Sequence, residues 1–273
     1  MRVGVTTTAV ALLVLLAGCS GIPGVGTDTG TETPGTDTNE LDALPGGIDN
    51  VSSATVDTHQ QRLADAGSYT TDITLTVDNR NETGEGQNLS LTQQFQVDLE
   101  SDTSLMVADP ARGLQSVYTD GNTTFVQAKA SANMTNAEAQ YAQTQTRNLD
   151  TKEASGATSM IIEENITYNR IGTETYNGAE VVRFEADENR SRAALERMFA
   201  ADSKTENVTV TEFSSTILVG ADGVVRHYDL SYTAENNGQT VTTAATIDVS
   251  NVGATTVTPP EWLEHAQNST SQA

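Results

Sequence analysis

Cysteine, lysine, histidine and aromatic residues are scarce in this chain of 273 residues. The one cysteine, Cys19, excludes an internal disulfide, and three histidines leave little for a metal site. Lysine is limited to three positions against 37 acidic residues, and the formal net charge is −23. Such a surplus argues against nucleic acid, and against an anionic membrane surface, as the main partner.

Motifs of nucleophilic and metal-dependent catalysis are also missing. The sequence has no Gly-x-Ser-x-Gly, Ser-x-x-Lys or His-Glu-x-x-His pattern. His59 lies on a predicted helix, His227 on the polar face of a predicted strand, and His265 in the C-terminal tail. Each is interpreted as a surface histidine rather than a catalytic base, because no partner stands nearby in the sequence. We therefore expect no enzyme, no catalytic residue and no cofactor.

One acidic run gives a weak metal alternative. Asp98, Glu100 and Asp102 alternate and can hold calcium if they share one strand face. Acidic residues occur throughout this chain, so we favour a solvated acidic edge and predict no metal site.

The N-terminus has the pattern of a targeting signal. Arg2 precedes an apolar run over residues 10–16, which is too short to span a bilayer as a helix. Leu16-Ala17-Gly18-Cys19 follows and resembles a bacterial-type lipobox, in which the cysteine sulfur carries the lipid. We predict a signal peptide over 1–18 and lipidation at Cys19; the alternative is an ordinary secretory signal with a chance cysteine.

A tether is predicted after the signal. Residues 19–47 are rich in Gly, Thr, Asp and Pro, and cannot bury enough apolar surface to offset their ordering entropy. Their coil dimension of about 30 Å holds a following domain just clear of a membrane. We therefore expect a protein anchored by lipid to the outer face of the cytoplasmic membrane.

A folded domain is predicted over residues 48–266, with a disordered tail over 267–273. A helix is expected over 51–66, capped by Asn50 or Ser52 and ended by Gly67. Strand-like alternation of apolar and polar residues follows over 69–78, 89–99, 224–233 and 241–249. One apolar and one polar face are typical of an antiparallel sheet covered on a single side.

Four Asx-Gly pairs and three further helices complete the predicted fold. The pairs supply the positive φ of tight hairpin turns at Asp120-Gly121, Asn177-Gly178, Asp222-Gly223 and Asn237-Gly238. Helices are expected over 136–148, 157–164 and 191–201. The prediction is an α+β fold with a curved antiparallel half-barrel of about eight to eleven strands, whose concave face is covered by helices. A closed barrel with external helices is the alternative.

Three stretches resemble the lipoprotein-carrier superfamily of the LolA, LolB and LppX types. Residues 117–126 are similar to a hairpin of its middle strands, 172–184 to its G-x-E-x-x-x-G-x-x-x-x-x-F/L hairpin, and 217–228 to its late hairpin with an acidic turn. The resemblance covers about residues 50–262. It implies a half-barrel capped by helices, whose concave apolar face binds an acyl chain or other lipid, with no catalytic residue.

The resemblance also has departures that bear on function. Carriers of this kind move lipids between two membranes, whereas the acidity here suggests a salt-loving archaeal cell without a second membrane. We expect a monomer that binds a lipid or other hydrophobic ligand through inward side chains, namely Phe95, Val97, Tyr228, Leu230, Leu195 and Phe199. Two alternatives stay open: a structural or interaction lipoprotein of the cell envelope with no ligand cavity, and a hydrolase.

Asn-x-Ser/Thr sequons are more frequent than composition predicts. About four are expected by chance, and an excess fits an exported, glycosylated surface. The alternative is accidental clustering in a threonine-rich sequence. Nine are present, at Asn50, Asn81, Asn88, Asn122, Asn133, Asn165, Asn189, Asn207 and Asn268.

Overall fold

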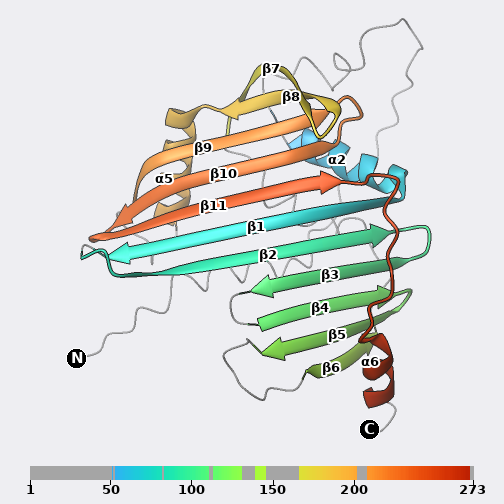
Figure 1. Cartoon of the computed structure of the whole chain (residues 1–273). Helices are drawn as coiled ribbons and strands as arrows, with labels where there is room; N and C mark the ends of the chain where they lie inside the picture. The colour runs from blue at the N-terminus through green and yellow to red at the C-terminus, as the bar shows by residue number, and fades with distance from the viewer. Residues whose placement is uncertain are drawn as a thin grey trace, which may run out of the picture. The chain divides into compact units, whose positions relative to one another are not determined.

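Eleven antiparallel strands form one sheet in the computed structural model (Figure 1). The structure describes residues 51, 53–81, 83–110, 113–130, 139–145, 166–201 and 208–270. The first six strands are β1 (Ser68–Asn81), β2 (Gly86–Asp98), β3 (Thr103–Pro110), β4 (Gly113–Asp120), β5 (Thr123–Ala130) and β6 (Gln140–Gln145). The others are β7 (Tyr168–Tyr176), β8 (Ala179–Ala186), β9 (Thr209–Gly220), β10 (Val225–Asn236) and β11 (Gln239–Ser250).

The strand order is β6-β5-β4-β3-β2-β1-β11-β10-β9-β8-β7. Two meanders, β1–β6 and β7–β11, therefore join through the pairing of β1 with β11. β6 and β7 follow each other in the sequence but form opposite edges of the sheet. The eleven described strands are an open sheet, so the closed-barrel alternative is wrong, whereas the predicted antiparallel sheet is confirmed.

The predicted turns are found where the Asx-Gly pairs stand. Asn177 and Asn237 take φ values of 48° and 49°, and the glycine after each also has positive φ. Gly121 and Gly223 likewise have φ values of 55° and 77° in the β4–β5 and β9–β10 turns. Each of these four turns fixes the register between the two strands that it joins, and so fixes which face each apolar side chain occupies.

Three helices are described: α2 (Ser53–Ala66), α5 (Glu188–Ala201) and α6 (Leu263–Thr270). The first two confirm the helices predicted over 51–66 and 191–201, although the predicted cap residues of the first lie outside the described part. Gly67, with a φ of 74°, follows α2 as expected. The helix predicted over 157–164 lies outside the described residues.

The helix predicted over 136–148 is wrong where it can be seen. Residues 140–145 form β6, which pairs with β5 along its whole length. Alanine and glutamine favour helix locally, but strand pairing and the packing of the Tyr141 ring on Trp262 and His265 override that preference. α6 also extends beyond the domain boundary predicted at residue 266.

The two faces of the sheet differ in charge. The uncharged face is defined here by the cross-strand row Gln93, Ile73, Ile247, Tyr228 and Ile217 of β2, β1, β11, β10 and β9; Phe95, two residues after Gln93, lies on it as well. The charged face is its reverse. Since directly opposite residues share a face, the intervening side chains, including His227 and Asp248, belong to the charged face.

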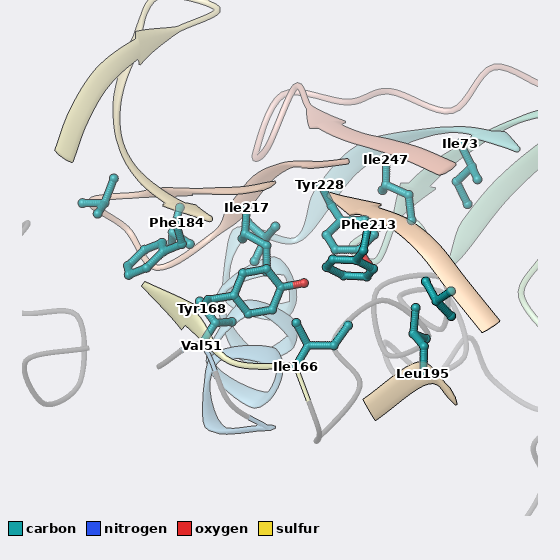
Figure 2. Packing of buried hydrophobic residues seen from close by; sticks show 14 residues of the cluster. Val51, Ile73, Ile166, Tyr168, Phe184, Leu195, Phe213, Ile217, Tyr228 and Ile247 are labelled. Carbon is teal, nitrogen blue, oxygen red and sulfur yellow. The ribbon is translucent and has the colours of Figure 1, made fainter. Parts of the chain in front are cut away.

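Most of the core lies on the uncharged face. This main cluster contains Tyr168, Val182, Ile217 and Val210, each with an exposed fraction of 0%. Figure 2 shows Tyr168, Phe213 and Tyr228 among the strands, with Leu195 reaching in from α5. A second cluster packs Leu63, Tyr69, Val97, Val224 and Val249 on the same face, beneath α2.

A third cluster lies on the charged face of β3–β6. The C-terminal segment, residues 251–270, crosses the sheet on the side opposite α2 and α5 (Figure 1). Its Val257 and Ala266 pack on Tyr118 and Phe125. The Thr255 amide donates to Ser68 Oγ over 3.1 Å, and Trp262 Nε1 donates to Ser116 Oγ over 3.2 Å. The opposite halves of one sheet are therefore covered on opposite faces.

Candidate functional site

Charge is excluded from most of the uncharged face. In β1–β6, β9 and β11, no charged residue has the register of this face within the described strands. In β10, Arg226 is the extra residue of the bulge at the start of the strand. Only the outer strands β7 and β8 place charged residues in this register, the exposed Arg170 and Glu180. In a chain of net charge −23, this separation leaves a broad surface on which apolar side chains stand among uncharged hydroxyls and amides.

Five of the six side chains predicted to bind ligand meet in or against the main cluster. Tyr228 and Leu195 are buried, with exposed fractions of 1% and 4%. Phe95, Leu230 and Phe199 are half-buried and pack against the cluster. That these side chains line a ligand site stays a prediction.

The sixth side chain, Val97, is in a different place. It is 1% exposed and belongs to the second cluster, where Leu63 of α2 covers it. Cross-strand pairing with Tyr69 fixes its position. Val97 shares the uncharged face with the others but lies under a different helix.

The polar groups of this face are hydroxyls and amides. Tyr168 Oη and Ser215 Oγ form a buried hydrogen bond of 2.9 Å, and Ser215 Oγ donates to the Asp229 carbonyl over 2.9 Å. The Tyr69 hydroxyl is buried without a hydrogen-bond partner among the described residues, and burial raises its pKa above the usual value. These groups accept or donate hydrogen bonds without carrying charge at neutral pH.

His59 holds α2 against the sheet. The imidazole is completely buried, and its Nδ1 accepts the Val225 amide over 3.1 Å. Burial, followed by the nearby Arg226, lowers the pKa of His59 to about 4, while Asp222 opposes the shift. The sequence interpretation of His59 as a surface histidine is therefore wrong. Its signal was present: Val56, His59 and Leu63 have helical spacing on one stripe.

Polar side chains fix α5 on the first residues of β9. Arg192 Nε donates to the Val210 carbonyl over 2.8 Å, and the Val210 amide donates to Glu196 Oε1 over 2.9 Å. Both backbone groups of a completely buried residue are thus satisfied by helix side chains. These two hydrogen bonds hold α5 so that Leu195 and Phe199 pack on the uncharged face.

A second histidine has partners on the charged face. His227 Nδ1 lies 2.7 Å from Asp248 Oδ1 and 3.2 Å from the Tyr176 hydroxyl, which also donates to Asp248. Burial, then the hydrogen bond to Asp248, raises the pKa of Tyr176 to about 12. His227 is expected from the sequence to be a surface histidine on the polar strand face; it lies half-buried on the charged face, and its partners are 21 and 51 residues away in the sequence. The cluster contains no serine, threonine or cysteine that could serve as a nucleophile, and it ties the β7–β8 turn to β10 and β11.

The acidic run serves a turn rather than a cation. Asp98 Oδ1 accepts the amides of Glu100 and Ser101 over 3.1 and 3.2 Å, and Asp102 has a φ of 54°. Glu100 and Asp102 therefore lie in the β2–β3 turn, so the three acids do not share one strand face. Across the described residues no group of three or more His, Cys, Asp or Glu side chains is arranged to hold a metal ion.

His265 is part of α6 rather than of a disordered tail. Its ring stacks on Tyr141, with centroids 6.1 Å apart. The C-terminal helix was missed because residues 251–262 show no strand or helix period before it. Its packing on β5 and β6 could only be found from the fold.

The predicted modification sites are partly described. Cys19 and four sequon asparagines, Asn50, Asn133, Asn165 and Asn207, lie outside the described residues. The other five asparagines are exposed: Asn81, Asn88, Asn122, Asn189 and Asn268. Within the described ranges, no helix has the length and apolar character needed to cross a membrane.

Solved structures similar to this chain include the following three. The chain is 12% identical to LprF from Mycobacterium bovis, covering 77% of this chain and 98% of that one, with a TM-score of 0.33. It is 8% identical to a LolA superfamily protein from Nitrosomonas europaea (78% and 96% covered, TM-score 0.20). It is 11% identical to a putative outer membrane lipoprotein-sorting protein domain from Vibrio parahaemolyticus (80% and 98% covered, TM-score 0.21).

TM-scores this low establish neither fold nor function. No curated protein matches the chain. A family model does match, over residues 4–266, and its description is a family of unknown function, DUF7537. Since that match spans nearly the whole chain, this protein belongs to the DUF7537 family.

Proposed function

We propose that this chain is a lipid-anchored, extracytoplasmic protein that binds a lipid or another hydrophobic ligand on the uncharged face, without catalysis. One observation carries the proposal: eight strands of a strongly acidic chain keep charge off one shared face. Solvation alone does not require this, because charged side chains are accommodated on any exposed strand face. A surface built to remain in contact with apolar groups does require it.

The covering of this face supports a ligand at one part of it. α2 and α5 pack over the clusters on β1, β9 and their neighbours. Away from them, Met106, Val117 and Val126 share the uncharged register but are only half-buried, as is Phe95, which packs against the main cluster. An acyl chain gains about 0.8 kcal/mol for each methylene that it buries on such a surface. We therefore place the ligand on these half-buried side chains, next to the part of the face that α2 and α5 cover.

A structural role is the second candidate, and one observation favours it. Tyr168, Val182 and Ile217 are already completely buried, so helices fill that part of the face without a ligand. In an interaction lipoprotein the uncharged face would serve only to pack the hydrophobic core and would bind no ligand. The two candidates therefore differ in what occupies the half-buried strands β2–β5.

The ligand is tested by purifying the full chain from its own membrane and analysing the lipid extract by mass spectrometry. We expect one apolar molecule in near-stoichiometric amount. Leu230→Asp places a charge on the uncharged face and should abolish the association. Ser231→Asp, the adjacent residue on the charged face, should retain it. An extract without an apolar ligand from folded wild-type protein would support the structural candidate.

The proposed anchor is at Cys19, and the proposed location is the outer face of the cytoplasmic membrane. The lipobox sequence and the tether support both. A monomeric, glycosylated form adapted to high salt is proposed on the sequons and the net charge. Cys19→Ser should release the protein into the medium, because stable attachment needs the lipid chains. A Ser variant that stays in the membrane fraction after a salt wash would contradict the anchor.

A further inference from the structure

Across the described strands β1–β5, the polar chemistry available to a ligand on the uncharged face is neutral. The charged side chains in its register, Arg170 and Glu180, are exposed on the outer strands β7 and β8. On β1–β5 its polar side chains are hydroxyls and amides, including Thr71, Gln93, Gln115, Thr119 and Thr124. Such groups satisfy the hydrogen bonds of an ester, ether or hydroxyl. None of them can balance the charge of a carboxylate or phosphate.

Three basic groups near the helices are already committed. Arg226 pairs with Asp222, and Arg192 holds the Val210 carbonyl and lies 3.8 Å from Glu188. His59 is completely buried and uses Nδ1 to accept a backbone amide. Recruiting any of them for an anion would break a contact that positions α2, α5 or β10.

Burial makes the lack of a free countercharge decisive for an anionic headgroup. An ionised headgroup loses its hydration on entering an apolar site, and the cost is several kcal/mol unless a countercharge is present. The surrounding net charge of −23 adds repulsion. A neutral headgroup avoids both the desolvation cost of a charge and the repulsion, because hydroxyls and amides replace its hydrogen bonds to water.

Resting on the proposed function, we infer that the ligand is an uncharged lipid, whose polar part is an ester, ether or hydroxyl and not a carboxylate or phosphate. The apolar chain lies on the half-buried side chains of β2–β5. The neutral polar part is held by the hydroxyls and amides among them.

A matched pair of fluorescent probes tests the inference on the full chain. Cis-parinaric acid and its methyl ester share one polyene chain and differ in charge at pH 8. We expect the ester to bind at least tenfold more tightly than the acid. Equal affinities, or tighter binding of the acid, would overturn the neutral-ligand inference while leaving hydrophobic binding intact. Binding of neither probe would count against the proposed function itself and would remove the inference with it.

A substitution on the face should reverse the preference. Gln93 lies on the uncharged face between Ile73 and Ala108 of the neighbouring strands. Gln93→Arg introduces the missing countercharge, so affinity for the acid should rise at least tenfold. Gln94→Arg is the matched control on the charged face, where the new cation lies beside Asp72, and it should leave both affinities unchanged. A folded Gln93→Arg protein that binds the acid no better would contradict the assignment.

Discussion

The main cluster of the β8–β11 half lies on the uncharged face of the sheet, whereas the C-terminal segment covers the charged face of the β3–β6 half. In β10 and β11 of the first half, large apolar residues alternate with polar ones, and the helices cover the uncharged face. In the second, neighbouring residues such as Val117 and Tyr118 place apolar groups on both faces. Strict alternation thus indicates a strand with one solvent-exposed face. Consecutive apolar residues indicate a strand that is packed against other segments on both faces.

The two halves are also held with different strength. The main cluster contains fourteen buried residues from strands, helices and the segment before β7. The C-terminal cluster contains four, and its covering segment relies on a few hydrogen bonds from Thr255 and Trp262. Local opening should therefore begin in the second half, where less apolar surface is lost.

The largest expected effect is in the main cluster. Phe184→Ala removes a ring that is 1% exposed, and should lower the free energy of unfolding by about 3–5 kcal/mol. Denaturant titration measures this. Ile171→Ala, at a side chain 56% exposed, is the control and should change stability by less than about 0.5 kcal/mol. A Phe184→Ala loss below 1 kcal/mol would remove the distinction between the two halves.

Acid should weaken the helix-covered half through His59. Its folded pKa of about 4 lies below the usual 6.5, so the neutral ring contributes stability that is fully present above pH 6.5. That contribution is lost as the pH falls toward 4 and amounts to about 3 kcal/mol. Unfolding at pH 7 and pH 4.5 measures it. In His59→Gln the difference between the two pH values should shrink; an unchanged difference would assign the acid sensitivity to carboxylates instead.

The smallest expected effect is confined to the C-terminal segment. Trp262→Phe removes the hydrogen bond to Ser116 and should cost about 1 kcal/mol. Hydrogen exchange should quicken in β4–β6 while β9–β11 stay protected. Ser116→Ala removes the same bond from the other side, so the two changes together should cost less than their sum. Faster exchange throughout the sheet would show that the halves open as one unit.

Local patterns predicted most of the fold. Alternation gave β1, β2, β10 and β11, and the Asx-Gly pairs gave four turns. Alternation and Asx-Gly pairs each depend on only a few neighbouring residues, so the sequence alone is enough to identify them. β6 was missed because its alanine and glutamine residues prefer helix until pairing with β5 decides otherwise.

Parts of the site depend on register between distant segments. The sequence allowed Phe95 and Tyr228 to be placed on one apolar face, and cross-strand pairing puts them there. The pairing of His227 with Asp248 follows from the hairpin turn at Asn237-Gly238. The contacts of Tyr176 with both could not be predicted, because β7 is distant from β10 and β11 in the sequence and is not adjacent to them in the sheet. The burial of His59 needed the position of β10 relative to α2.

The pairing of β1 with β11 has a consequence for how the protein folds. Thr70 lies opposite Ser250, so the central pair of the sheet closes a loop of nearly the whole domain. Loop closure of this length is entropically costly, and sheets rich in distant pairs fold slowly. The first strand must wait for the last one to emerge from synthesis or export. Until then β1 and β10 each present an open hydrogen-bonding edge, the kind of surface on which chains aggregate before they fold.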